Sequence, residues 1–304
     1  MFLEATCLFL LSIRGASASI GRRPFYVFGH MANSLADVDN FVAQGVNAVE
    51  ADLRFASDGT ALKFYHGALC DCRRDCEKSA EVTAYLAYLR DAVNEGGKFA
   101  GKLQLLYIDT KTRNLPPGRK YEAGISLANN LMRYLWNNGA IPSESMLNVI
   151  LSAVTTMNAD ILSGALDTFK GAKNSSLYLD HIGFDISGNE LLSIIAWTYE
   201  ELGILQHRWQ GDGLTNCLID VYWDLRTIAV TSRRTAANTT HDYVDKAYVW
   251  TVDKPYSMRR FLRKNIDGIM TNVPTTLLNI LKEDEFLKTY RLATTQDSPW
   301  KRIV

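Results

Sequence analysis

The sequence has no surplus charge of either sign, no long apolar run beyond its first residues, and no repeated or low-complexity tract. Its 33 Lys and Arg residues equal its 33 Asp and Glu residues, so we expect no broad electrostatic field and no bulk binding of nucleic acid. No later stretch approaches the ~20 apolar residues of a membrane span, so no transmembrane anchor is expected. A composition of 47% hydrophobic and 22% charged residues is typical of a globular domain, which we expect to be a monomer.

The first 18 residues resemble a cleavable leader. A short apolar stretch ends in Ala16-Ser17-Ala18, which is a small-residue cleavage pattern, although Glu4 and Arg14 depart from the usual leader composition. We interpret residues 1–18 as a signal peptide of a secreted protein and residues 19–304 as one catalytic domain. The alternative is an ordinary N-terminal extension.

Two glycosylation sequons, at Asn174 and Asn238, fit an extracellular location.

Cysteine is scarce, and its distribution also fits secretion. Cleavage of the leader would remove one of the five cysteines and leave four: Cys70, Cys72, Cys76 and Cys217. An even number in a secreted chain indicates two disulfides, and a zinc site is disfavoured because no Cys-x-x-Cys pair is present. A Cys70–Cys72 bond would be strained. Of the two remaining pairings, we favour Cys70–Cys76 with Cys72–Cys217.

Short β-rich runs alternate with helical patterns along the whole chain. This alternation predicts a parallel sheet, and eight strands in about 280 residues predict a single-domain α/β fold of the (β/α)8 TIM-barrel type. The predicted strands are Tyr26–Gly29, Ala48–Arg54, Leu103–Asp109, Val149–Ser152, Gly183–Ile186, His207–Gln210, Tyr248–Val252 and Gly268–Thr271. The predicted helices are Ala36–Gln44, Ala80–Asn94, Tyr121–Asn137, Asn158–Phe169, Glu190–Glu201, Ile219–Ser232 and Tyr256–Lys264.

An insertion follows the second strand. The turn signal Ser57-Asp58-Gly59 lies between two apolar runs, 53–55 and 62–65, which predicts a hairpin. The hairpin carries His66 and leads into the cysteine cluster. We therefore expect a disulfide to clamp the loop that places this histidine.

Three carboxylates are expected at one end of the barrel. A strand alternates its side chains, so Glu50 and Asp52 must point to the same face, and Asp109 ends the next strand. Carboxylate oxygens are ligands that Mg²⁺ prefers, with water and substrate phosphate completing its shell. The sequence therefore predicts one magnesium site made by Glu50, Asp52 and Asp109.

Further polar residues follow the same strand ends. His30 and His66 can exchange a proton near neutral pH, and Lys111 can offer a point charge to a phosphate. Active groups of TIM barrels lie where strands end and loops begin.

Three other candidates end later strands. Trp250 can either cover a choline head group by cation–π contact or pack in the core. Asp253 is expected to orient a histidine or to bond a loop, and Asn272 to bond a phosphate oxygen or to cap a turn.

Several motifs together resemble the arachnid sphingomyelinase D or phospholipase D family of dermonecrotic toxins, over about residues 23–300. The motifs are Phe28–Asn33, Val49–Asp52, Tyr65–Gly67, Cys70–Cys72, Ile108–Thr112, Ser187–Asn189, Trp209–Cys217, Trp250–Lys254 and Ala293–Trp300. The resemblance implies a magnesium-bearing barrel related to glycerophosphodiester phosphodiesterases. It also supports the favoured disulfide pairing, which is that of the two-disulfide class.

The resemblance implies the same roles for the site residues. It makes His30 and His66 the catalytic pair and places the metal on the three carboxylates. It places Lys111, Trp250, Asp253 and Asn272 around the substrate, where we also expect Tyr248.

The leading hypothesis is a secreted, magnesium-dependent phosphodiesterase acting on phospholipid at a membrane surface. The resemblance implies head-group cleavage from sphingomyelin or from lysophospholipids such as lysophosphatidylcholine. Attack by the lipid's own hydroxyl would give a cyclic phosphate and free choline, which makes the enzyme formally a lyase. One alternative is a glycerophosphodiester phosphodiesterase that gives open, hydrolysed products, and another is a non-catalytic secreted lipid-binding protein.

Overall fold

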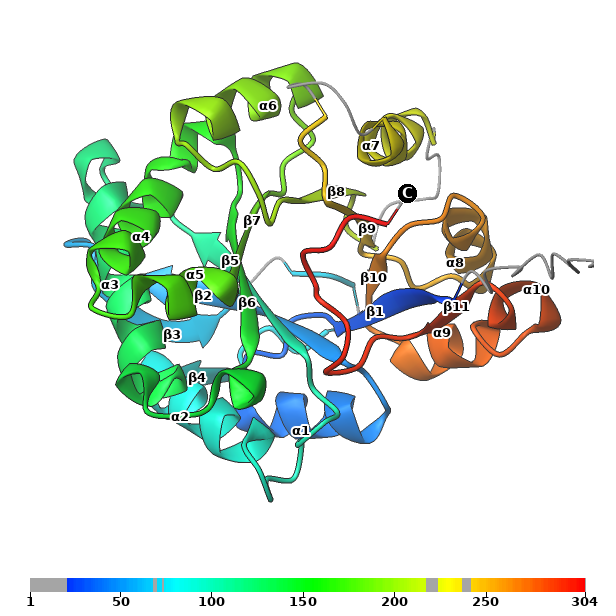
Figure 1. The fold of residues 1–304 in the computed structure, drawn as a ribbon, viewed down its shortest axis with the longest axis horizontal. Helices are drawn as coiled ribbons and strands as arrows, with labels where there is room; N and C mark the ends of the chain where they lie inside the picture. The colour runs from blue at the N-terminus through cyan, green and yellow to red at the C-terminus, as the bar shows by residue number, and fades with distance from the viewer. Residues whose placement is uncertain (1–20, 68–69, 73, 217–223, 237–241, 304) are drawn as a thin grey trace, which may run out of the picture.

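Eight parallel strands form a barrel surrounded by helices (Figure 1). The computed structural model describes residues 21–303 except 68–69, 73, 217–223 and 237–241. The strands are adjacent in the order β7-β6-β5-β2-β1-β10-β9-β8, and a bridge between Phe184 and Arg208 closes the ring from β7 to β8. The predicted TIM-barrel fold is therefore confirmed. The predicted signal peptide, 1–18, lies outside the described residues.

All eight predicted strands are present. The barrel strands are β1 (Arg23–Gly29), β2 (Ala48–Phe55), β5 (Leu105–Lys111), β6 (Asn148–Ala153), β7 (Ile182–Ile186), β8 (Trp209–Gly213), β9 (Lys246–Trp250) and β10 (Gly268–Thr271). The largest difference is in β8, which begins and ends later than predicted. Two of its residues, Gly211 and Gly213, pair with Tyr248 and Trp250, and these aromatic side chains fill the space that the glycines leave.

Helices follow the strands along the chain and cover the outside of the barrel (Figure 1). They are α1 (Leu35–Ala43), α2 (Val82–Val93), α3 (Lys120–Asn130), α4 (Asp160–Gly171), α5 (Ser175–Asp180), α6 (Leu192–Glu201), α7 (Leu225–Thr235), α8 (Pro255–Leu262), α9 (Pro274–Ile280) and α10 (Asp284–Leu287). The predicted helix over 121–137 is interrupted, because α3 ends at Asn130 and a π-helical turn, η2 (Leu131–Leu135), follows. In the described part of the chain, no helix combines the length and the apolar character that a bilayer span requires.

Alternating side chains of the strands build two apolar cores. In β1, Tyr26 and Phe28 point into the barrel, where they meet Trp209 and Tyr248 in aromatic contacts. Phe25 and the other outward-facing strand residues instead pack against the helices. The barrel interior is therefore filled largely by aromatic rings, with smaller apolar side chains between them.

The predicted hairpin is also present. Strand β2 continues beyond the barrel and pairs antiparallel with β3 (Ala61–Tyr65), which pairs with β4 (Ser79–Glu81). Gly59 holds a φ of +93°, and the Asp58 side chain accepts a hydrogen bond from the Thr60 amide at 2.9 Å. These features are those of a tight turn.

A last short strand, β11 (Tyr290–Leu292), pairs with the beginning of β1.

Helices α3 and α4 approach each other closely, because each has a glycine at the contact. A Cβ atom added to Gly164 would lie 2.0 Å from the Tyr121 carbonyl oxygen, and one added to Gly124 would lie 2.1 Å from that of Ile161. Backbone atoms cannot yield as a flexible side chain can. Larger residues would therefore force the two helices apart.

We expect Gly164→Ala to lower the free energy of unfolding by about 1–3 kcal/mol, because the new methyl group overpacks the contact between the helices. Urea unfolding followed by circular dichroism measures this change. Gly171→Ala is the matched control in the same helix, since its Cβ would meet no atom within 4 Å. Equal stability of the two variants would contradict the close approach.

Candidate active site

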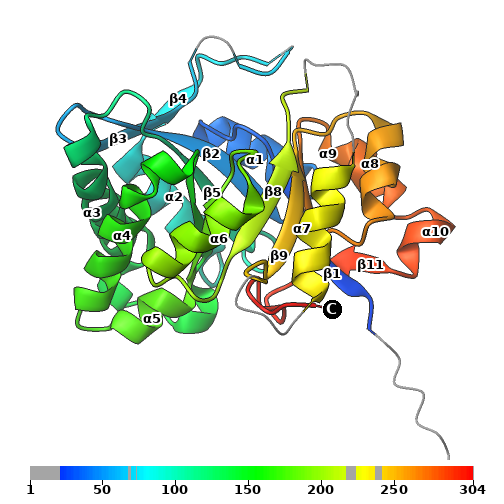
Figure 2. The same ribbon diagram turned by 90° about the horizontal axis from the view of Figure 1, so that it is seen from above.

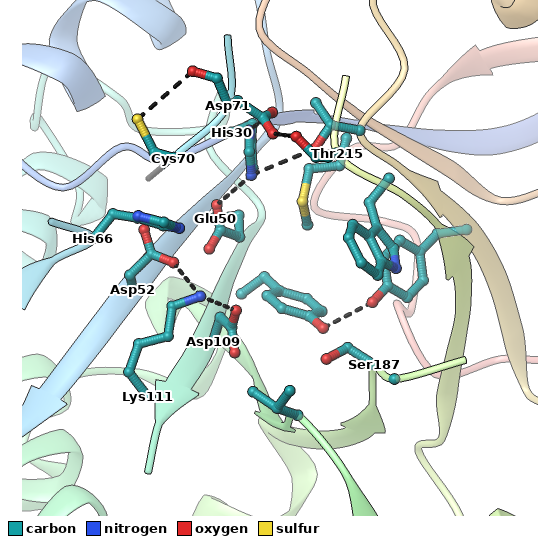
Figure 3. A pocket seen from close by; sticks show the side chains of 17 residues that line it. His30, Glu50, Asp52, His66, Cys70, Asp71, Asp109, Lys111, Ser187 and Thr215 are labelled. Carbon is teal, nitrogen blue, oxygen red and sulfur yellow. Dashed lines mark hydrogen bonds and ion pairs between the residues drawn. The ribbon is translucent and has the colours of Figure 1, made fainter. Parts of the chain in front are cut away.

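Three carboxylates converge at the carboxyl ends of β2 and β5 (Figure 3). Glu50 and Asp52 share a face of β2, and the strand register places Asp52 directly beside Asp109. One oxygen atom of each carboxylate lies within 4.8 Å of one oxygen atom of each of the others. Glu50 and Asp52 are almost fully buried. The expected convergence is therefore present in the structure.

Lys111 compensates part of this negative charge. Its Nζ atom lies 2.7 Å from Asp52 Oδ1 and 2.5 Å from Asp109 Oδ2. Burial alone would raise the pKa of Asp52, but Lys111, His66 and the hydrogen bond from Asn33 together lower the pKa below its ordinary value. Burial opposes the charge of Lys111 as well, yet Asp109 and Asp52 raise its pKa above the ordinary value.

Glu50 remains undercompensated. Burial first, and then the neighbouring Asp52, raise its pKa to about 8. Its Oε2 atom accepts a hydrogen bond of 2.7 Å from the Met31 amide. Met31 holds a φ of +56°, a left-handed conformation that a residue other than glycine seldom adopts. Such conformations concentrate at functional sites, where the surrounding structure enforces them.

The carboxylate cluster fits a hard divalent cation. Its donors are all oxygen atoms, and Asp109 Oδ1 is buried without a hydrogen-bond partner among the described residues. A second cation beside Lys111 would offset the charge that raises the pKa of Glu50. Mg²⁺ prefers this donor set.

His30 follows β1 and faces the same cluster. Its Nδ1 atom lies 3.1 Å from both Asp71 Oδ2 and Asn272 Oδ1, and its Nε2 atom lies 3.8 Å from Glu50 Oε2. Burial alone would lower the pKa of His30, but the Asp71 carboxylate and then Glu50 outweigh it and raise the pKa to about 9. The imidazole is thus fixed by one nitrogen and directs the other toward the carboxylates.

Asp71 is a site residue that the sequence analysis did not single out. It is buried, and its Oδ1 atom accepts a hydrogen bond of 2.5 Å from Thr215, on the loop after β8. Burial would raise its pKa, but the hydrogen bond and charge of His30, together with the hydrogen bonds from Thr215 and Asn272, lower it well below the ordinary value. The only signal in the sequence was its position between Cys70 and Cys72. The contact itself depends on how the loop folds.

His66 lies on the inserted hairpin and lines the same cavity as His30. Arg54, near the end of β2, donates hydrogen bonds to the carbonyl oxygens of Tyr65, at 3.1 Å, and of His66. These bonds fix the backbone at the histidine. Arg54 was also missed by the sequence analysis, which read the segment only as a strand.

A disulfide joins Cys70 and Cys76, as predicted, and closes the loop after His66. Within this loop, Arg74 donates hydrogen bonds to the carbonyl oxygens of His30 and Met31, at 2.9 and 3.1 Å. The disulfide loop therefore connects the segments that carry the two histidines.

The second predicted disulfide involves Cys217, which lies outside the described residues. Cys72 is disulfide-bonded, and its amide donates a hydrogen bond of 3.0 Å to the side chain of Asn216, the residue before Cys217.

Asp253 and Asn272 lie behind the histidine and do not line the cavity. Asp253 accepts hydrogen bonds from the Asn272 amide at 2.8 Å, from its side chain at 2.9 Å, and from Asn216 at 2.6 Å. Asn272 in turn contacts His30. Asp253 thus bonds the loop that contains Asn216, and it supports His30 indirectly, through Asn272.

Aromatic residues of β9 form one wall of a cavity of about 270 Å³. Trp250 lies at this wall, partly exposed, and its Nε1 atom has no hydrogen-bond partner among the described residues. The Tyr248 hydroxyl is deeper and donates to Asp185 at 2.8 Å. Lys111 lines the same cavity, together with Glu50, Asp52 and Asp109.

Of the two sequons, Asn174 is exposed just before α5, and Asn238 lies outside the described residues.

Comparison with known proteins decides the family. The family model for dermonecrotic toxin SPH matches residues 20–300. The chain belongs to the dermonecrotic toxin SPH family. A dermonecrotic toxin SPH of Ixodes scapularis is 43% identical over 93% of this chain and 77% of its own length. The dermonecrotic toxin StSicTox-betaIB1i of Sicarius terrosus is 40% identical over 92% of this chain and 99% of its own length.

Solved structures agree on the fold of this family member. The structure of a putative glycerophosphoryl diester phosphodiesterase from Silicibacter pomeroyi matches with a TM-score of 0.56 and 13% sequence identity. The match covers 89% of this chain and 97% of that protein. A glycerophosphodiester phosphodiesterase from Parabacteroides distasonis matches with a TM-score of 0.54 and 17% sequence identity. The match covers 86% of this chain and 98% of that protein. At such low identity the likeness shows the barrel fold alone.

In the metal-free protein we expect His30 to titrate near 9, and Asp71→Asn to lower this pKa toward the ordinary 6.5. Because the pKa is raised on folding, protonated His30 stabilises the fold fully below about pH 6.5 and loses this contribution as the pH rises through about 9. Histidine NMR titration measures the pKa. Asp75→Asn, an exposed site in the same loop, should leave it unchanged. A pKa near 9 in Asp71→Asn would contradict the pairing.

Proposed function

We propose that this chain is a secreted, magnesium-dependent phosphodiesterase that removes the head group from sphingomyelin or lysophospholipids such as lysophosphatidylcholine. The observation that carries the proposal is the set of three converged carboxylates, with Lys111 and both histidines lining the same cavity. Membership of the dermonecrotic toxin family supports it. The complete set also argues against a non-catalytic lipid binder, because such a protein would have no need to keep each of these buried charges.

Glu50, Asp52 and Asp109 would hold the magnesium ion. A bound Mg²⁺ supplies a Lewis acid that polarises the phosphoryl group. Lys111 adds a second positive charge to this end of the cavity, since its ammonium already lies between two of the carboxylates. The positive charge is thereby available where negative charge develops on the phosphoryl oxygens.

His30 and His66 act as the acid–base pair. One imidazole takes the proton of the lipid's own hydroxyl as its oxygen forms a bond to phosphorus. The other donates a proton to the choline oxygen as its bond to phosphorus breaks, so the products are a cyclic phosphate and free choline. Asp71 and Asn272 hold His30 by Nδ1 and leave Nε2 for the transfer. Positioned groups of this kind typically contribute 10²–10⁴-fold each.

The aromatic wall can receive the head group. Trp250 is partly exposed in the cavity and presents a surface suited to a quaternary ammonium. Tyr248, Asp253 and Asn272 support the substrate region from deeper positions. All these groups come from one chain, so a monomer suffices for the reaction.

An extracellular location fits the disulfide chemistry. The Cys70–Cys76 bond closes a loop beside both histidines, and such bonds persist in oxidising compartments. The site needs this loop to be closed, which ties the proposed activity to secretion.

The second candidate function is a glycerophosphodiester phosphodiesterase that gives open products. It is favoured by the barrels of that activity that share this fold. The two candidates differ in which oxygen attacks phosphorus: the lipid's own hydroxyl in the first and water in the second.

Apolar side chains at the cavity end of the barrel suit a membrane substrate. Met157, Leu191 and Leu225 follow β6, β7 and β8, and their exposed fractions are 82%, 69% and 69%. Water-exposed apolar side chains of this kind insert into the interface of a bilayer. We propose that this end docks on the membrane.

We expect Glu50→Gln, His30→Ala and His66→Ala each to lower turnover by about 10²–10⁴-fold, because each removes a metal ligand or an acid–base group. Phosphorus NMR with sphingomyelin and lysophosphatidylcholine measures head-group release and separates cyclic from open phosphate. A chelator should stop the reaction, and Mg²⁺ should restore it. His181→Ala is the matched control, since His181 precedes β7 at the other end of the barrel.

Turnover that persists in Glu50→Gln and in the presence of chelator would refute the proposed mechanism. An open phosphate product would favour the glycerophosphodiesterase. Vesicle binding without turnover on any of these lipids would favour the non-catalytic lipid binder.

We expect the double variant Met157→Ser and Leu191→Ser to lower turnover on sphingomyelin vesicles about tenfold, because less apolar surface enters the bilayer. Turnover on lysophosphatidylcholine below its micelle concentration should be unchanged. Leu205→Ser is the control: this residue is also 69% exposed but precedes β8, at the opposite end. An equal loss in the control, or a loss on monomeric lipid, would argue against docking by these loops.

A further inference from the structure

A basic groove of about 830 Å³ crosses the end of the barrel opposite the cavity. It is formed by the segment before β1, the end of α7, the loop before β10, strand β11 and the C-terminal residues. In Figure 2 the β3–β4 hairpin rises at one end of the barrel, whereas β11 and the C-terminus lie at the other. Among the described residues, seven Lys and Arg side chains line this groove, and Asp297 is the one Asp or Glu that does. In a chain with no net charge, this is a strong local surplus.

Carboxylates offset only part of this surplus: Asp297 pairs with Arg291 at 2.6 Å, and Asp245 pairs with Arg302 at 3.0 Å. Asp267 is fully buried and is shared by three cations: Arg23 at 2.9 Å, Arg234 at 2.5 Å and Lys246 at 3.9 Å. Arg234 and Lys246 are themselves nearly inaccessible to solvent. Arg234 Nε and Lys246 Nζ have no hydrogen-bond partner among the described residues. Buried Arg234 therefore adds positive charge to the lining of the groove beneath the exposed cations.

Three exposed cations lie along the rim: Arg22, Lys288 and Lys301. Within the described part of the chain, none of them forms an ion pair with a carboxylate. They come from three separate segments, before β1, between α10 and β11, and near the C-terminus, and they line one groove of about 830 Å³. A ligand with several anionic groups along one chain can pair with all three.

The position of the groove decides between two kinds of polyanion. If the cavity end docks on a membrane, as the proposed function requires, the basic groove faces away from that membrane. An anionic bilayer could not then occupy the groove during turnover. Outside a cell, a flexible polyanion in solution or in the extracellular matrix could occupy the groove during turnover. Sulfate groups suit this site, because Arg and Lys form charge-assisted hydrogen bonds with such oxyanions.

We propose that the amino-terminal end of the barrel binds a sulfated glycan, and that this binding leaves the active site open. The groove holds the enzyme to a polyanionic matrix while the opposite end works on lipid. This orientation argument rests on the proposed function, but binding of the glycan itself does not.

The test uses a heparin octasaccharide as the probe and isothermal titration calorimetry as the measurement. Arg22→Gln, Lys288→Gln and Lys301→Gln combined should weaken binding about tenfold or more and flatten its salt dependence, since exposed charge contacts are lost. Lys170→Gln, Lys173→Gln and Lys282→Gln combined are the matched control, because they remove equal charge from exposed sites elsewhere. The control should bind as the unchanged protein does.

Two further measurements separate this proposal from the proposed function. Glu50→Gln should bind the octasaccharide with unchanged affinity, whether or not it has lost turnover. Saturating octasaccharide should leave turnover of monomeric lysophosphatidylcholine unchanged within about twofold, because the two ends of the barrel are separate.

Equal affinity of the groove variant and the unchanged protein would overturn the proposal. So would an equal loss in the control, which would indicate a dependence on overall charge alone. Binding to anionic phosphatidylserine vesicles through the same three residues, without binding of the octasaccharide, would also overturn it and would assign the groove to a membrane.

Discussion

Strand geometry forces three carboxylates together in a largely buried space, and much of the site is arranged around this constraint. Alternation along β2 directs Glu50 and Asp52 to one side, and the register with β5 adds Asp109. Like charges in a medium of low dielectric repel strongly unless cations or hydrogen-bond donors offset them. Lys111 offsets part of the charge, while burial first and then Asp52 raise the pKa of Glu50 to about 8. A further cation at the cluster would favour the ionised form of Glu50.

The histidines depend on a different kind of support. The loop that carries His66 is held by backbone hydrogen bonds from Arg54 and by the Cys70–Cys76 disulfide. From the same loop, Asp71 contacts the His30 imidazole, and Arg74 donates a hydrogen bond to the His30 carbonyl oxygen. The inserted segment therefore helps to position both imidazoles, with Asn272 as a further partner of His30, whereas the carboxylates are positioned by the barrel. Loss of the loop would leave the carboxylate cluster without two positioned imidazoles beside it.

The sequence predicted the parts of the site that depend on regular structure. Alternation placed Glu50 and Asp52 on one face, and the Ser57-Asp58-Gly59 turn predicted the hairpin. It did not predict the His30–Asp71 contact, because that contact depends on the path of an irregular loop. The glycines of β8 also weakened the strand signal, although they are needed where Tyr248 and Trp250 pack. Local pattern therefore located the strands, whereas packing between distant segments determined the details.

A net charge of zero describes the whole chain but not its two ends. The carboxyl ends of the strands carry the acidic cluster, and the amino ends carry the surplus of Lys and Arg. A barrel strand of seven residues spans roughly 23 Å, which exceeds the Debye length of about 8 Å at physiological ionic strength. Solvent-exposed charges at the two ends are therefore largely screened from each other. The expectation of no broad electrostatic field remains reasonable at long range, but local charge at each end can still select its own ligand.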